Sequence, residues 1–157
     1  MNLINLKRWI KASVIKAFKD EAGGQQLFIE GEDRRTDKTA SHLELRIDGP
    51  YYTPNGSKGE YRAYVEINVL VNSTRNQENV YERENLQGIA QQMLNRDICV
   101  YKIGNVGRNS ADDESLFGIL QLMQGDQIKL SDFGNVDDHA ELYQAVAEAH
   151  YTMYFSE

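Results

Sequence analysis

The chain of 157 residues has a formal net charge of −7, with 41% hydrophobic and 26% charged residues. This length suits a single domain over residues 1–157 with a core of its own, and the composition excludes a wholly disordered chain. The negative charge argues against nucleic acid as a tightly held ligand, because phosphate binding needs clustered lysine and arginine.

The sequence gives no sign of membrane insertion or secretion. No stretch approaches the roughly 20 consecutive apolar residues of a membrane span. The N-terminal residues lack the order of charged and then apolar segments that marks a signal peptide. We therefore expect a soluble protein that stays in the compartment where it is made. Cys99, the one cysteine, lies in the apolar run 98–101, so we expect a small buried side chain.

The first predicted element is a helix over residues 3–22. Its apolar residues recur at spacings of three and four and line one face: Leu3, Leu6, Ile10, Val14, Ala17 and Phe18. Residues 7–19 carry five basic side chains and no acid: Lys7, Arg8, Lys11, Lys16 and Lys19. We expect this basic surface to be solvated, or to form salt bridges with an acidic neighbouring subunit, rather than to touch nucleic acid or membrane.

A short strand is predicted at 26–30, and two longer strands follow. Apolar and polar residues alternate over 43–48 and again over 61–71, which is typical of strands with one buried face. Between them, residues 49–59 contain both prolines, three glycines and an Asn-Gly turn signal. We expect this segment to be a projecting loop, with Tyr51 and Tyr52 exposed at its base.

The second half of the chain predicts one helix and several strands. The expected elements are a helix at 80–95, a strand at 98–103, a loop at 104–115, strands at 116–123 and 128–130, and a turn-rich stretch at 132–138. Residues 140–155 are ambiguous, because their alanines and glutamates favour a helix, whereas the odd-numbered residues from 143 to 155 are all apolar or aromatic, as in a strand. We favour a long terminal strand, since packing overrides propensity.

Together these elements predict an α+β fold: a mainly antiparallel sheet with a long hairpin and two helices packed on one face. The expected core contains apolar side chains from both long strands and the second helix: Leu45, Ile47, Val65, Ile67, Val69, Leu86, Ile89 and Met93.

Residue patterns for chemistry are absent. The histidines His42, His139 and His150 show no ligand spacing. His42 and His150 each lie in a strand-like alternation, where we expect a surface or pairing role. No nucleophile has an activating neighbour, and no phosphate-binding loop occurs. The acidic clusters at 30–33, 112–114 and 137–138 suit solvated loops. We expect no catalytic residue, no cofactor and no bound metal.

The order of parts resembles the tail terminator, or tail-completion, proteins of long-tailed bacteriophages. The shared layout is a basic amphipathic helix at 6–11, a long hairpin at 43–71, a helix at 85–90 and a closing strand at 149–155. The resemblance implies a homo-oligomeric ring, usually of six copies, in the neck of the virion. Such a ring caps the tail tube, receives the head connector, lets DNA pass without specific binding, and is not an enzyme.

Five residues are candidates for contacts in such an assembly: Tyr51, Tyr52, Asn55, Lys58 and Arg108. They lie in the predicted loops 49–59 and 104–115, and projecting loops often carry partner contacts. Two alternatives stay open. One is a small intracellular adaptor or chaperone-like binding domain, and the other is an enzyme, such as a nuclease or hydrolase, with a dispersed site in the acidic loops.

Overall fold

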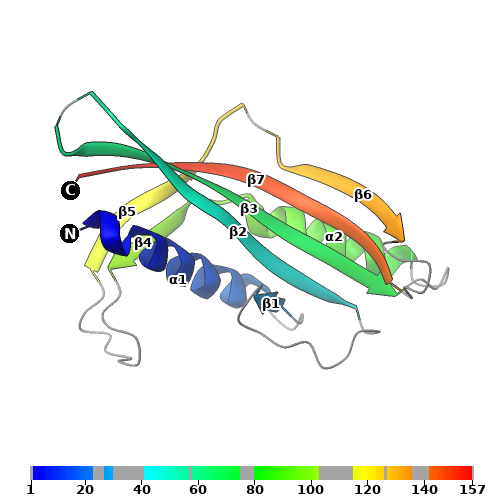
Figure 1. The fold of residues 1–157 in the computed structure, drawn as a ribbon. Helices are drawn as coiled ribbons and strands as arrows, with labels where there is room; N and C mark the ends of the chain where they lie inside the picture. The colour runs from blue at the N-terminus through cyan, green and yellow to red at the C-terminus, as the bar shows by residue number, and fades with distance from the viewer. Residues whose placement is uncertain are drawn as a thin grey trace.

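The computed structural model describes residues 2–22, 27–29, 41–56, 58–74, 80–102, 115–125, 127–135 and 142–156. These residues form two helices and seven strands (Figure 1): α1 (Asn2–Ala22), β1 (Leu27–Ile29), β2 (His42–Pro54), β3 (Glu60–Thr74), α2 (Val80–Leu94), β4 (Ile98–Lys102), β5 (Ser115–Leu122), β6 (Lys129–Asn135) and β7 (Leu142–Ser156). The predicted α+β class is confirmed.

The sheet is built around three long strands in the order β2, β3 and β7. β3 pairs antiparallel with β2 on one side and with β7 over its whole length on the other. The free side of β7 is shared, because β6 pairs with its first half and β5 pairs near its C-terminal end. β4 extends the sheet beyond β5, and β1 adds a short parallel strand to β2. β7 therefore lies in the middle of the sheet.

The terminal segment is a strand, as the alternation predicted. Its odd-numbered residues from Ala145 to Phe155 are buried, whereas most of its even-numbered residues are at least partly exposed. The alanines at 145, 147 and 149 thus lie on the buried inner face of the sheet, where their packing outweighs their helix propensity.

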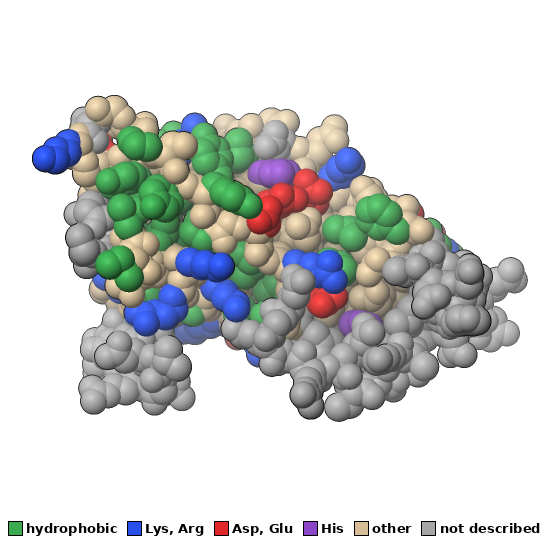
Figure 2. Space-filling model, in the orientation of Figure 1, with side chains coloured by type: hydrophobic (Ala, Val, Ile, Leu, Met, Phe, Trp, Pro, Cys, Tyr) green, Lys and Arg blue, Asp and Glu red, His purple; other side chains and the backbone are tan. Residues whose placement is uncertain are grey.

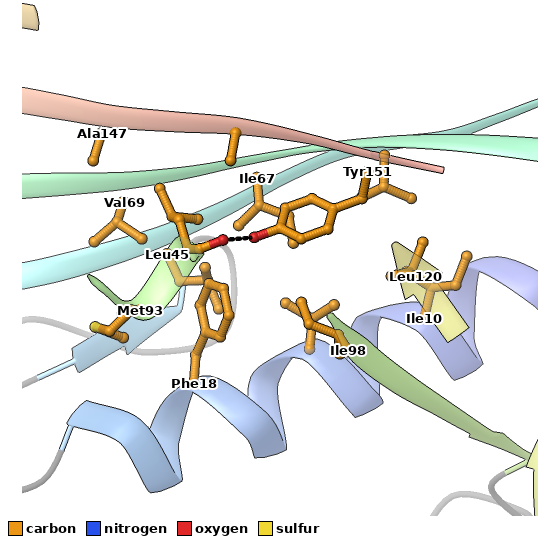
Figure 3. Close-up of a cluster of buried hydrophobic side chains, with 14 of the residues drawn as sticks. Ile10, Phe18, Leu45, Ile67, Val69, Met93, Ile98, Leu120, Ala147 and Tyr151 are labelled. Carbon is orange, nitrogen blue, oxygen red and sulfur yellow. Dashed lines mark hydrogen bonds between the residues drawn. The ribbon is translucent and has the colours of Figure 1, made fainter. Parts of the chain in front are cut away.

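Both helices pack on the same face of the sheet and share one core (Figure 3). Six of the eight predicted core residues are buried, and the other two, Ile47 and Ile89, are partly buried against the same cluster. α1 contributes the predicted stripe, with Leu6, Ile10 and Phe18 almost fully buried. The core prediction is therefore confirmed, with Ile47 and Ile89 at its margin.

The predicted loop at 49–59 is too long. β2 continues to Pro54 and β3 begins at Glu60, so only residues 55–59 connect them. Glycine and proline are accommodated in β2 for two reasons. The register shifts between Asp48 and Tyr51, with Gly49 at a φ of 104°, and among the described residues the pairing of β1 with β2 covers 43–45. A bulged strand with an open edge tolerates proline.

Three further expectations are corrected. Cys99 is exposed, because Ile98 and Val100 on either side of it point into the core. His42 is buried in β2 opposite Asn72, so the surface role expected for it is wrong, whereas the pairing role is compatible with its position. β6 runs to Asn135 through part of the expected turn at 132–138, with a register shift around the exposed Phe133.

Several predictions fall outside the described residues, namely most of the loop 104–115, the three acidic clusters and His139. Within the described part of the chain, neither helix is long and apolar enough to cross a membrane.

Candidate functional site

The face of the β2–β3–β7 sheet opposite the helices is the main candidate surface, and we call it the outer face. Residues paired across antiparallel strands share a face, so the register assigns its members. One row contains Tyr51, Tyr64 and Thr152, and the next contains Asp48, Glu66 and His150. Figure 2 shows hydrophobic side chains gathered near the hairpin, and a histidine beside acidic side chains further along the sheet.

Two tyrosine rings contact one arginine on the outer face, and a third tyrosine lies in the adjoining row. The Arg62 guanidinium carbon lies 4.6 Å from the ring centre of Tyr64 and 5.5 Å from that of Tyr154, which suits cation–π contact. Its Nε donates a hydrogen bond of 2.9 Å to Oγ1 of Thr152. Tyr51 lies opposite Tyr64 in the register. We call Tyr51, Arg62, Tyr64 and Tyr154 the tyrosine–arginine surface.

Tyr51 is fixed to this surface by its hydroxyl. The hydroxyl donates a hydrogen bond of 2.9 Å to Oδ1 of Asp48. That hydrogen bond, with the negative charge of Asp48, raises the pKa of Tyr51 above its ordinary value. The ring nevertheless remains 61% exposed, and Tyr154 remains 54% exposed. Large apolar area is therefore held in place and left open to solvent.

A chain of aromatic contacts supports the hairpin from the other face. Tyr52 meets Tyr61 edge to face at 5.9 Å between ring centres, and Tyr61 stacks on Phe155 at 5.5 Å. Phe155 contacts Phe117 at 5.7 Å, and Phe117 meets Trp9 of α1 at 5.2 Å. The far end of the hairpin is thereby connected to α1 through side-chain packing.

A second cluster on the outer face contains two carboxylates and one imidazole. Glu66 of β3 lies directly opposite His150 of β7, and Glu148 lies two residues earlier on β7, so all three side chains point the same way. One ligand atom from each lies within 4.8 Å of the others. Nε2 of His150 is 2.8 Å from Oε1 of Glu148. Two carboxylates and an imidazole can hold a proton or a metal ion between them.

An open pocket with a volume of about 350 Å³ adjoins this cluster. Its lining includes Gly125, Gln127 and Lys129, together with Glu148 and His150. The side chains of His150 and Glu148 are 41% and 34% exposed. Small polar ligands and water can therefore reach both residues.

A groove between α1 and the strands β1 and β2 is the third candidate surface. It has a volume of about 150 Å³, and its lining is apolar except for Lys7 and Lys11 at α1. The remaining lining residues are Ile10, Ile29, Leu45, Ile47, Gly49 and Pro50. Positive charge beside apolar surface gives this groove a character opposite to that of the acidic chain as a whole.

The predicted contact residues are only partly brought together. Tyr51 and Tyr52 are both exposed, but they project from opposite faces of β2. Asn55 and Lys58 lie exposed in the connection between β2 and β3. The backbone N–H of Asn55 donates a hydrogen bond of 2.9 Å to the backbone carbonyl oxygen of Glu60. Arg108 lies outside the described residues.

Sequence reasoning missed the partners of these tyrosines and the Glu66–Glu148–His150 cluster. Within each strand, the signal was available: Arg62, Tyr64 and Glu66 alternate with buried residues, as do Glu148 and His150. The sequence did not show that β3 pairs with β7, and this pairing brings the residues together.

Comparison with known proteins supports the fold alone. No protein-family model matches the chain, and no curated protein matches it. Nineteen chains of solved structures do match. One of them, which carries no functional name, has a TM-score of 0.57 and 10% sequence identity, over 96% of this chain and 97% of its own.

Proposed function

We propose that this protein is a virion structural subunit, a tail terminator that forms a ring on the tail tube and joins it to the head connector. The layout of helix, long hairpin, helix and closing strand motivates the proposal. The observation that carries it furthest is the set of exposed tyrosines near the end of the hairpin: Tyr51, Tyr52 and Tyr154, which are 61%, 49% and 54% exposed.

These tyrosines have the properties of interface residues. Tyrosine and arginine are enriched at binding hot spots, because they give a large contact area at a low cost in conformational entropy. Arg62 orders the rings on the outer face, and the aromatic chain to Trp9 supports Tyr52 on the other face. An already ordered surface loses little entropy when a partner binds.

A ring needs two different surfaces on each subunit, because neighbours meet head to tail. The tyrosine–arginine surface, with Asp48 beside it, is one candidate. The groove at Lys7 and Lys11 is the other, since its positive charge complements an acidic neighbour. A net charge of −7 also suits a channel through which DNA passes without being held.

The first test is the oligomeric state of the purified protein, measured by light scattering after gel filtration and by negative-stain electron microscopy. We expect rings, and we expect the double change Tyr51→Ser and Tyr154→Ser to reduce them to monomers with unchanged circular dichroism. Tyr81→Ser is the matched control, because Tyr81 is 83% exposed at the start of α2, far from the hairpin.

The second test addresses the terminator role itself. Rings should bind to the ends of isolated phage tail tubes and should not coat their sides. A wild-type protein that stays monomeric at high concentration contradicts the ring proposal and favours the alternative of a small adaptor domain. Rings that form but do not bind to tube ends would support the assembly and contradict the terminator role.

A further inference from the structure

We propose that Glu66, Glu148 and His150 form a binding site for a divalent transition-metal ion of the zinc class. The three ligand atoms already lie within 4.8 Å of one another. Zinc binds imidazole nitrogen and carboxylate oxygen at about 2.0–2.2 Å. Small side-chain rotations are therefore enough to bring all three ligands to one ion.

The backbone positions these ligands rigidly. Glu66 and His150 are directly paired within the long β3–β7 ladder, and Glu148 is on the same face, two residues from His150. Ligands on paired strands keep their spacing without an ordered loop. Sites on such elements are more accurate than sites on loops.

The charges of the cluster favour a cation. Two carboxylates face one imidazole, and Asp48 lies beside Glu66 in the same row of the sheet. The described hydrogen bond to Glu66 is a long one, 3.5 Å from Nδ2 of Asn68.

Three basic side chains lie on the same face of the sheet as the cluster: Arg46, Arg62 and Lys129. Arg62 is directed to Thr152 and the tyrosine rings, and Arg46 lies 3.4 Å from Glu44. Lys129 lies opposite Glu148 in the register.

The ligand set indicates which ion binds. One imidazole with two carboxylates suits zinc, cobalt or manganese, whereas calcium and magnesium prefer oxygen ligands alone. The ion would take the place of the proton between Nε2 of His150 and Oε1 of Glu148. The adjoining pocket at Gln127 and Lys129 leaves room for water on the open side of the ion.

The experiment is a titration of chelator-treated protein with zinc chloride by calorimetry, together with the visible absorption of the cobalt-loaded protein. We expect one ion per chain and a visible cobalt absorption that changes or disappears in His150→Gln. His150→Gln and Glu66→Gln should each weaken binding by roughly 10–100-fold or more, since losing even an outer partner of a metal ligand has that effect. Glu44→Gln is the control, because Glu44 is on the outer face in a different row.

Thermal unfolding gives an independent readout, because an ion that binds the folded state raises its melting temperature. Zinc should raise that temperature in the wild type and in Glu44→Gln, and not in His150→Gln. An absence of zinc binding would overturn the proposal, as would equal affinity of the His150→Gln protein. Neither measurement depends on ring formation, so this proposal and the proposed function can fail separately.

Discussion

The hydroxyl of Tyr151 in β7 donates a hydrogen bond to the carbonyl oxygen of Leu94 at the C-terminal end of α2 (Figure 3). The last carbonyls of a helix have no partner within the helix, and Leu94 is fully buried. The side chain of Tyr151, also fully buried, thus completes the helix end and joins α2 to the middle of the sheet.

Replacing Tyr151 by phenylalanine should lower the free energy of unfolding by about 1–3 kcal/mol, because a buried carbonyl is left without its donor. Urea denaturation of the two proteins measures the difference. Tyr81→Phe removes an exposed hydroxyl and should change the midpoint little. Equal midpoints for all three proteins would contradict the role assigned to the hydroxyl.

Stability should also fall at alkaline pH through Tyr151. Burial raises the pKa of Tyr151 well above its ordinary value of 10.0. Above about pH 10 the unfolded chain releases this proton while the folded chain keeps it, so rising pH favours unfolding. Below that pH the contribution to stability is fully present. Melting temperatures between pH 8 and 11 should therefore decline less steeply in Tyr151→Phe than in the wild type.

Gly49 should be the most sensitive glycine of the hairpin. Its φ is 104°, and an added Cβ would lie 2.9 Å from the carbonyl oxygen of Tyr64. Gly56 has a φ of 77°, but nothing lies within 4 Å of its added Cβ. Gly49→Ala should lower the melting temperature more than Gly56→Ala, because only Gly49→Ala adds a clash with the backbone. Equal shifts would mean that the bulge can move to accept the methyl group.

Cys99 should react without unfolding. Its side chain is exposed on β4, so the thiol reagent DTNB should label one thiol per folded chain in the absence of denaturant. Its neighbour Val100 is buried, so Val100→Cys in a Cys99→Ser background is the matched control and should react slowly. A wild-type protein that reacts only in denaturant would contradict the strand orientation.

Reversing charge at the α1 groove should weaken assembly. The double change Lys7→Glu and Lys11→Glu puts negative charge where an acidic neighbour is proposed to bind, and it should lower the ring fraction measured by light scattering. The double change Lys16→Glu and Lys19→Glu is the control, because it changes the net charge by the same amount on the same helix but outside the groove, and it should affect assembly less. The wild-type ring fraction should fall with added salt, because exposed charge pairs are screened. Equal effects of the two double variants would exclude a specific role of the groove.

The sequence predicted elements whose alternation or helical spacing is long and regular. The terminal strand was predictable because residues 145–155 alternate, and α1 was predictable from its apolar stripe. The length of the loop at 49–59 was overestimated, because glycine and proline, here Gly49 and Pro50, are also tolerated in bulged edge strands. Cys99 was wrongly expected to be buried, because a run of apolar residues does not show which side chains point into the core.

The candidate site was less predictable, for a physical reason. Glu66 and His150 are far apart in the chain, and they meet only through the β3–β7 register. Glu148 and His150 share one face of β7 at a spacing of two residues, but two residues alone do not indicate a site, and Glu66 joins them only through the strand pairing. A pattern search along one strand cannot detect a site whose parts are joined by hydrogen bonds between strands.

The central position of β7 also has a kinetic consequence. β7 follows every other described element in the chain, yet it lies between β3 and the strands β5 and β6. During synthesis, β3 must therefore wait with an unpaired edge until β7 has left the ribosome. Contacts between residues so distant in sequence make folding slow, and waiting strand edges invite pairing with other chains. We therefore expect the yield of folded protein to depend on how fast β7 docks.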